Sequence, residues 1–363
     1  MRRFRQHDET PFGHGERGAW LGRDCTSADS KAISDGSYDY RLLELSEEAR
    51  SWLQQLKTRD FVAREGAICT RISTEEWISG WNKMSECTAS APGSGHYGHY
   101  KTVSLAARLP KDHEDHTTVL ADLYASMWSM PLLHGFSPKR WQSCVDAILE
   151  KVPGKPILEK LQIIMLYEAD FNFVLKLVWG KKLVQHAEKH QSLGECNHGS
   201  RTGRQTHDAL LQKLLLYEQA RLSRTSLVTV DNDAKSCYDR IIKTLGLLAC
   251  ICFGLPILAA KMHNDTHDGM QHSIRSRHGL FQPYSGSGSQ PLEGSGQGSG
   301  ASPAIWLLLC TTLLQAFQGY TNGMEVVFPF ESTVLCILAI FYVDEGTPGV
   351  NDVTRHSSES LRL

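Results

Sequence analysis

The sequence predicts a mixed α/β protein built from long helices and a few short strands. Apolar residues recur at helical spacing over residues 168–190 and 206–221. Apolar runs rich in β-branched residues at 162–166, 226–230 and 334–343 predict strands. The chain has 363 residues, of which 41% are hydrophobic and 21% are charged. This composition suits one large or two modest globular domains and excludes collagen-like, fully disordered and disulfide-scaffold proteins.

Charge and cysteine content leave the partner open but favour an intracellular protein, cytoplasmic or nuclear. The 38 basic and 40 acidic residues give a net charge of -2, so no global basic field indicates nucleic acid, although a local patch is compatible with this total. The ten cysteines form no C-x-x-C pair and predict buried thiols in a reducing compartment. No apolar stretch follows Arg2, Arg3 and Arg5, which argues against a cleaved secretion signal.

The apolar stretches predict a protein that does not span a membrane. The longest lie at 247–260, 304–314 and 334–343. Each is shorter than the roughly 18 to 20 residues that a membrane-spanning helix needs. The stretches therefore argue against a multi-pass membrane protein.

The N-terminal part predicts a leader followed by a helical region over 41–150. Residues 1–40 are polar, glycine-rich and without period, which indicates a loose polar leader. A surface helix is expected over 40–57, and another begins at Ser73, whose hydroxyl can form a capping box with Glu76.

The remainder of this helical region contains two interruptions. A proline and three glycines break the pattern at 88–100 and predict a loop. Helical spacing returns over 119–150, with a break at 135–138.

The C-terminal part is predicted to alternate strands with helices. The strand at 162–166 leads into the helix at 168–190. The helix at 206–221 carries an apolar face that we expect to pack in the core. That face consists of Leu210, Leu211, Leu214, Leu215 and Tyr217.

A glycine-rich segment at 284–300 has the composition of a flexible linker but ends at a helix start. Ser302 is expected to cap a helix that runs to residue 317, with Pro303 in its first turn. Another helix is expected over 241–252, after the strand at 226–230.

Carboxylates follow two of the predicted strands. Asp231 and Asp233 come after the run at 226–230, and Asp344 and Glu345 end the run at 334–343. Acidic groups at the ends of buried strands repel one another unless a cation lies among them, which makes them candidates for a divalent-metal site. Aspartate is also common where a turn begins, so periodicity alone leaves this simpler interpretation open.

Three motifs in the second half of the chain have a recognisable spacing and order. They are Asp-Ala-Lys-Ser-Cys-Tyr-Asp at 233–239, Gln-Gly-Ser-Gly-Ala-Ser-Pro at 297–303 and Phe-Tyr-Val-Asp-Glu at 341–345. Together they resemble the palm motifs of reverse transcriptases from non-long-terminal-repeat (LINE-like) retrotransposons.

Further matches lie upstream in the family's order. Residues 199–209 are similar to its G-x-R-x-G-R-x-T-x-D-A block, residues 160–164 occupy the place of its K-x-R-x-I fingers strand, and the loop near Pro92 resembles the one before the fingers. The resemblance spans about residues 88–345. It implies a right-hand polymerase of fingers (151–225) and palm (226–345), with an antiparallel palm sheet backed by helices.

The resemblance also implies the catalytic chemistry. Nucleotidyl transfer uses two divalent ions that activate the primer hydroxyl and stabilise the leaving pyrophosphate. Asp233 and Asp344 would be the shared ligands of two Mg²⁺ or Mn²⁺ ions, with Glu345 as a third catalytic carboxylate. Asp231 and Asp239 are expected to serve as turn and salt-bridge residues.

Six residues are implied to contact the incoming nucleotide. Tyr238 would lie under the sugar and exclude a 2′-hydroxyl, although a core role for this ring is also open. Gln297 and Gly298 offer an amide and a close backbone approach. Lys160, Arg201 and Arg204 would contact phosphates.

Charge along the predicted fingers is consistent with such contacts. Residues 139–224 contain 14 Lys and Arg against nine Asp and Glu, in a chain whose total charge is -2. A basic excess of this kind suits phosphate contact, and solvated helix faces would account for it equally well.

The sequence departs from the family at three places. Glu345 replaces an aspartate and is longer by one methylene, and Gln162 replaces an arginine that would contact triphosphate. Residues 346–363 form a polar tail with little strand propensity, and no thumb follows. Activity is therefore uncertain.

The sequence thus predicts a truncated or degenerate RNA-directed DNA polymerase whose partners would be an RNA template, a DNA primer and deoxynucleoside triphosphates. Nothing in it indicates a protein partner. One alternative is a non-catalytic remnant that binds nucleic acid through basic fingers, with salt-dependent affinity. Another is a gene fragment without a stable fold.

Overall fold

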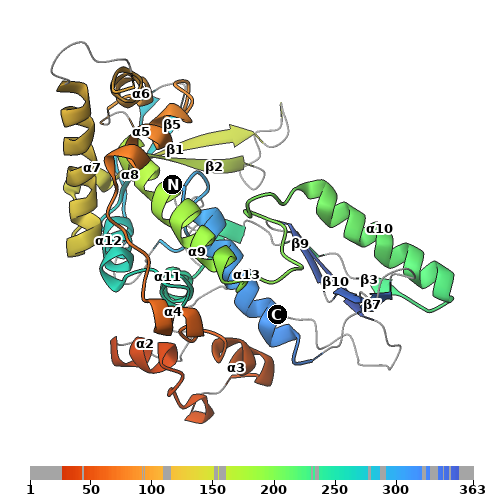
Figure 1. The fold of residues 1–363 in the computed structure, drawn as a ribbon. Helices are drawn as coiled ribbons and strands as arrows, with labels where there is room; N and C mark the ends of the chain where they lie inside the picture. Colours follow the sequence, from red (N-terminus) through yellow and green to blue (C-terminus); the bar gives the residue numbers. More distant parts are fainter. Residues whose placement is uncertain are drawn as a thin grey trace.

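The protein has a mixed α/β fold, as predicted, in which helices pack against one end of a four-stranded sheet and a second, smaller set of strands lies beside a long helix (Figure 1). We describe it from a computed structural model. The described residues are 27–42, 45–91, 93, 95–108, 116–150, 154, 161–229, 232–233, 237–276, 279–286, 292–320, 324–327, 334–337, 339–342 and 345–350.

The N-terminal part of the described chain is helical. Its α-helices are α2 (Ser27–Ser34), α3 (Glu47–Leu53), α4 (Asp60–Glu65), α5 (Thr74–Asn82), α6 (Tyr97–Ala106) and α7 (His116–His134). The predicted capping box is confirmed, because the Ser73 hydroxyl accepts the Glu76 amide and the Glu76 carboxylate accepts the Ser73 amide. The helix predicted over 40–57 is shorter, since only a 3₁₀ turn (Tyr40–Leu42) and α3 form there.

Helix α6 begins inside the segment predicted to be a loop. His96 lies at its N-cap, where the ring nitrogen Nδ1 accepts the amide of Gly98 at 3.0 Å. Tyr97 and Tyr100 are buried in the first turn, so burial of aromatic side chains favours helix despite the glycines. Helix α7 ends at His134 and Gly135 follows with φ of +67°, which confirms the predicted break.

The prediction of helix up to residue 150 is wrong, because β1 (Ser143–Glu150) is a strand at the centre of a sheet. It pairs antiparallel with β2 (Leu161–Tyr167) and parallel with β5 (Gln271–Ser276), and β6 (Gly279–Leu280) completes the order β2-β1-β5-β6. Short apolar runs fit either structure by spacing alone, and here pairing with a distant strand decides. The predicted strand at 162–166 is confirmed as β2.

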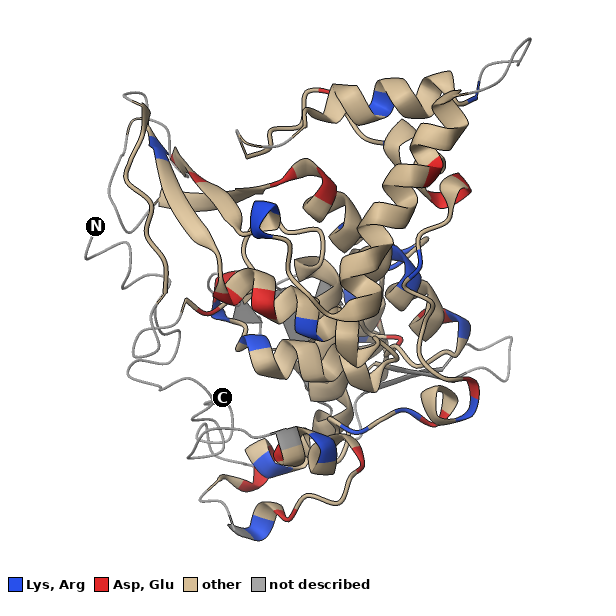
Figure 2. Cartoon of the chain, turned by 90° about the vertical axis from the view of Figure 1, so that its left-hand side faces the viewer, with Lys and Arg blue, Asp and Glu red and all other residues tan. Residues whose placement is uncertain are grey.

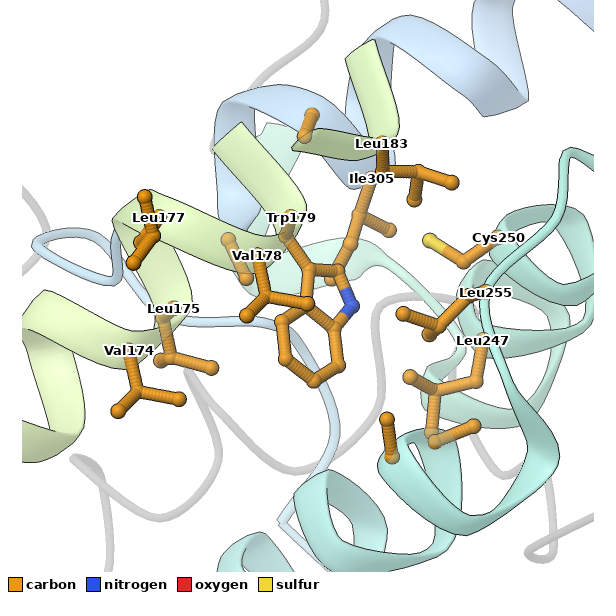
Figure 3. Packing of buried hydrophobic residues seen from close by; sticks show 14 of the residues in the cluster. Val174, Leu175, Leu177, Val178, Trp179, Leu183, Leu247, Cys250, Leu255 and Ile305 are labelled. Atoms are coloured by element: carbon orange, nitrogen blue, oxygen red, sulfur yellow. The ribbon is translucent and has the colours of Figure 1, made fainter. Parts of the chain in front are cut away.

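One continuous helical column crosses the core. It consists of α8 (Ala169–Leu175), a π-helical segment (Lys176–Leu183) and α9 (Val184–Lys189), which confirms the helix predicted over 168–190. Every residue of α8 is buried, so this part is not amphipathic. Figure 3 shows Trp179 of the π segment between Val178, Leu247, Leu255 and Ile305.

Three further helices pack against this column and each other. They are α11 (Lys243–Cys252), α12 (Ile257–Asp268) and α13 (Ser302–Phe317). The helix at 302–317 is confirmed with proline in its first turn, but Ser302 is not its N-cap. Its hydroxyl instead donates to the carbonyls of Ser295 and Gly296, both at 2.8 Å, and so holds the glycine-rich segment against the helix start.

A second region forms around α10 (Thr206–Ser223). Beside it, Figure 1 shows the short strands of an antiparallel sheet and a hairpin. These strands are β3 (Val228–Thr229), β4 (Asn232–Asp233), β9 (Ala339–Tyr342) and β10 (Glu345–Val350), and the hairpin is β7 (Met324–Val327) with β8 (Val334–Ile337). The run at 334–343 is therefore two strands rather than one.

Helix α10 does not bury the face predicted for it. Leu210, Leu211 and Leu214 are more than half exposed, at 56%, 56% and 59%, and Tyr217 is also exposed. The buried residues are Ala209, Leu216 and Ala220. The spacing identified the helix correctly, but the small strands beneath it cover only a narrow stripe of its surface.

The prediction of little strand structure in the tail at 346–363 is wrong for residues 346–350, and residues 351–363 lie outside the described part of the chain. Strand β10 pairs with β3 and β4 on one edge and with β9 on the other. Its Pro348 lies opposite Ala339 of β9. Within the described residues, no helix is long and apolar enough to cross a bilayer.

Candidate functional site

The two acidic strand ends lie side by side in the antiparallel sheet. In the register of β4 and β10, Glu345 is opposite Asp233 and Gly346 is opposite Asn232. Residues directly opposite in such a pair have Cα atoms about 4.5 to 5.5 Å apart. Two acidic positions that are distant in the sequence therefore share one place in the fold.

A tight hairpin presents the second acidic pair. Tyr342 of β9 pairs with Glu345 of β10, so residues 343 and 344 connect the two strands. Asp344 lies outside the described residues, as do the side chains of Asp233 and Glu345. The backbone register nevertheless places β4, which contains Asp233, beside β10, which begins directly after Asp344.

The Gln297 side chain joins three of the predicted motifs. Its Oε1 accepts a hydrogen bond from Gln162 Nε2 at 2.5 Å, and its Nε2 donates to Asp239 Oδ2 at 3.2 Å. Its backbone carbonyl accepts the amide of Met165 in β2 at 2.7 Å. The position where the family has arginine, here Gln162, is therefore in direct contact with the glutamine of the glycine-rich motif.

The described end of the glycine-rich segment, residues 296–300, packs against β2 and α8, so this part is not a flexible linker. Gly298 has φ of +109°, and a Cβ there would lie 2.4 Å from the Met165 carbonyl oxygen. Asn172 holds both ends of this turn, since Nδ2 donates to the Gly298 carbonyl at 3.1 Å and Oδ1 accepts the Gly300 amide at 2.7 Å. The absence of a side chain at Gly298 therefore allows the backbone of the glycine-rich segment to lie close to β2.

Tyr238 lies in a 3₁₀ turn (Cys237–Arg240) just after the first acidic strand. Its half-buried ring packs against the large hydrophobic core, which is the simpler of the two roles considered for it. Its carbonyl accepts the amide of Ser295 at 2.8 Å, so the turn is tied to the glycine-rich segment. Asp239, expected to be a salt-bridge residue, accepts from Gln297.

The predicted phosphate-binding arginines have carboxylate partners. Arg201 is 5% exposed and pairs with both oxygens of Glu188 at 2.8 Å, while its Nη1 donates to the carbonyls of Gly194 and Asn197. Arg204 pairs with Glu195. A phosphate contact by Arg201 would require breaking this buried pair, whereas Lys160 lies outside the described residues.

Charge is mixed over the surface of the described chain. Figure 2 shows Lys and Arg interspersed with Asp and Glu rather than gathered on one element. Within the basic segment at 139–224, Lys182 pairs with Glu76 at 2.7 Å and Lys189 with Glu65 at 3.3 Å. Part of the basic excess is therefore used to join α9 and the π segment to the N-terminal helices.

A buried carboxylate pair lies at the start of α8. Arg140 pairs with Asp170 and, at 3.5 Å, with Glu168, and the indole of Trp141 donates to Asp170 at 3.1 Å. Burial raises the pKa of Glu168 to about 7, the neighbouring Asp170 adds to this increase, and Arg140 opposes it. Glu168 thus has a pKa near neutral pH, and no sequence motif marks this residue.

A buried group of metal-binding type lies elsewhere in the fold, and no sequence motif predicts it. Cys144, Asp146 and His272 are close enough for one ion to contact all three. They belong to β1 and β5, which are far apart in the sequence, so no spacing motif marks them. Only the parallel pairing of the two strands brings them together.

No protein-family model matches the chain, and no curated protein matches it.

Proposed function

We propose that this protein is a reverse-transcriptase-like polymerase whose fingers and palm carry out RNA-directed DNA synthesis. The observation that carries the proposal is the pairing of Asp233 in β4 with Glu345 in β10. A two-metal mechanism requires carboxylates from separate strands at one point, and the backbone register of these two strands supports such an arrangement.

The proposal gives each acidic residue a role. Asp233 and Asp344 would hold Mg²⁺ or Mn²⁺ through carboxylate oxygens, the ligands that such hard cations prefer, with Glu345 beside them. When bound, these ions lower the pKa of the primer hydroxyl and stabilise the pyrophosphate that leaves. The contribution of the carboxylates would be to hold the two ions at fixed positions.

The neighbouring residues would position the nucleotide. Tyr238, one turn after Asp233, would limit the space beneath the sugar, and the Gln297 amide keeps one N–H free of the two hydrogen bonds described for its side chain. Gln162 carries no positive charge. Lys160, the residue just before β2, would therefore be the cationic group that contacts the phosphates there. Arg201 would hold the loop at 194–201 rather than a phosphate.

Primer extension tests the activity. The full chain is incubated with an RNA template, a DNA primer, deoxynucleoside triphosphates and Mg²⁺ or Mn²⁺. We expect incorporation that falls by more than about 100-fold in Asp233→Asn and in Asp344→Asn, since each loses a metal-binding charge. Asp231→Asn is the matched control, two residues away on the same segment, and should retain activity.

Nucleic-acid binding separates the proposal from its main alternative. A non-catalytic remnant would bind RNA in a salt-dependent way, with no incorporation and with affinity indifferent to Mg²⁺ and to Asp233→Asn. That combination would contradict polymerase function while leaving the binding function in place.

A designed disulfide tests the register without requiring activity. Cysteines replacing Asn232 and Gly346 would face one another across β4 and β10 and should form a disulfide under mild oxidation, detected by peptide mapping. The control pairs Asn232→Cys with Thr347→Cys, which moves the second thiol to the opposite face of the strand. Equal cross-linking of both pairs would disprove the register on which the proposal depends.

A further inference from the structure

Three side chains of metal-binding type share one face at the centre of the four-stranded sheet. In the parallel pair of β1 and β5, Cys144 is in register with His272. Asp146 lies two residues beyond Cys144 and therefore on the same face of β1. All three residues are buried, with exposed fractions of 1% for Cys144 and Asp146 and 5% for His272.

The distances between the three donor atoms match one coordination sphere. Asp146 Oδ1 lies 3.2 Å from His272 Nδ1 and 3.8 Å from Cys144 Sγ, and all three atoms lie within 4.8 Å of one another. In a tetrahedral zinc site, bond lengths of roughly 2.0 to 2.3 Å place neighbouring ligand atoms about 3.3 to 3.6 Å apart. Small side-chain rotations would convert the observed arrangement into one face of that tetrahedron.

The surroundings of Asp146 are those of a metal-binding carboxylate. Its second oxygen, Oδ2, accepts a hydrogen bond from the Tyr284 hydroxyl at 2.5 Å, which leaves Oδ1 directed at the sulfur and the imidazole. Tyr284 is itself fixed, since its amide and carbonyl both pair with His272 at 2.8 Å. Outer hydrogen bonds of this kind orient the ligands of metal sites.

Charge favours a divalent cation at this point. A buried carboxylate is costly unless it is neutralised, and the ion pair described for Asp146 is with His272. A divalent ion would compensate both this carboxylate and a Cys144 thiolate, whose proton passes to solvent when the metal binds. Sulfur and imidazole donors select zinc over magnesium, which prefers oxygen ligands.

We propose that Cys144, Asp146 and His272 bind a zinc ion that fastens β1 to β5, with a water molecule at the fourth position. The ion would join residues that are far apart in the sequence at the middle of the sheet, and Tyr284 would hold the carboxylate in place. This site is separate from the proposed magnesium site at β4 and β10.

Metal content tests the proposal directly. The full chain, purified without chelators, should contain about one zinc per chain. Cys144→Ala and Asp146→Asn should each lose the metal. Cys250→Ala is the matched control, because Cys250 is an equally buried thiol in α11 outside the cluster, and it should retain zinc. Zinc retained by both cluster variants would overturn the proposal.

Tyr284 provides a graded test of the outer hydrogen bond. Tyr284→Phe keeps the ring and the three ligands but removes the hydroxyl that binds Asp146. We expect zinc affinity, measured by competition with a chromophoric chelator, to fall roughly 10- to 100-fold. An unchanged affinity would contradict the assigned role of Asp146 as a ligand.

Cobalt substitution needs no variant and therefore covers the case in which the cluster variants fail to fold. Co²⁺ bound at this site should show thiolate charge-transfer absorption together with the bands of tetrahedral coordination. Wild-type protein that contains no zinc and gives no thiolate band with Co²⁺ would show a metal-free hydrogen-bond network instead. Asp233→Asn should leave both signals unchanged, so this result does not depend on polymerase activity.

Discussion

The described residues form two hydrophobic cores of very different size. The large core extends from Ile33 to Leu309 and includes most of the tryptophans, whereas the small core is limited to α10 and two strands. The buried members of the small core are Ala209, Leu216, Ala220, Ile337 and Ile340. The acidic strands β4 and β10 belong to the sheet on the small core, so the proposed catalytic carboxylates lie in the less extensively packed region.

Aromatic stacking explains the depth of the large core. The Trp81 ring stacks on Phe173 with centroids 4.6 Å apart, and it also meets Tyr100 and Trp128. Gly80 allows this approach, because a Cβ there would lie 2.6 Å from the Phe173 ring. The small core contains no tryptophan among its described residues and is built from two alanines, a leucine and two isoleucines. Regions with few buried apolar contacts open at lower free energy, so we expect the acidic strands to exchange amide hydrogens faster than α8.

The largest expected effect is from a cavity in the large core. Phe173→Ala should lower the free energy of unfolding by about 3 to 5 kcal/mol, because it removes a fully buried ring that links α8 to α5. Denaturant unfolding followed by tryptophan fluorescence measures this change, and Phe173→Leu should cost less. A loss below about 1 kcal/mol would show that this core is not the main source of stability.

The next effect should be confined to the small core. Leu216→Ala removes a buried side chain of α10 and should cost about 2 to 3 kcal/mol, detected as faster hydrogen exchange in α10 and β9 with little change in α8. Leu214→Ala is the matched control, since this leucine is 59% exposed and its loss should cost less than about 0.5 kcal/mol. Equal exchange in α8 and α10 would mean that the two cores unfold together.

The smallest effect concerns pH and the large core. Because burial raises the pKa of Glu168 to about 7 from 4.5, the folded state binds its proton more tightly than the unfolded state does. Its contribution to stability is complete below about pH 4.5 and is lost as the pH rises through 7. We expect the free energy of unfolding to fall by about 1 to 2 kcal/mol, because the half-exposed Arg140 nearby stabilises the carboxylate form.

Comparison with Glu168→Gln isolates this effect. Burial lowers the pKa of His263 to about 3, so that histidine changes stability in the opposite sense over part of the same range. It does so in both proteins, and the difference between their unfolding free energies at pH 5 and pH 8 therefore reports Glu168. A difference that is independent of pH would contradict the raised pKa.

Local signals predicted the elements that local contacts determine. The capping box at Ser73, the proline at the start of α13 and the break after His134 depend on residues within one turn of each other. Strand β1 was missed because its structure depends on pairing with β2 and with the distant β5, which the spacing of its own residues does not show. The exposed face of α10 was missed for a related reason, since spacing defines an apolar face but not what covers it.

The candidate sites differ in the same way. The order of motifs indicated Asp233, Asp344 and Glu345 as one group, and the register of β4 with β10 is consistent with that expectation. Cys144, Asp146 and His272 form no motif, and parallel pairing in the folded sheet alone makes them neighbours. Arg201 shows the opposite outcome. Its motif predicted a contact with phosphate, but in the structure its guanidinium pairs with a carboxylate of the protein, Glu188.

Strand β10 also sets a lower limit on the length of a functional piece of this chain. It is the shared neighbour of β3, β4 and β9, which pair with no other strand of that sheet among the described residues. A chain cut after residue 344 would keep both aspartates yet leave three strands without the backbone hydrogen bonds that align them. A fragment made to test the proposed polymerase activity should therefore extend at least to Val350.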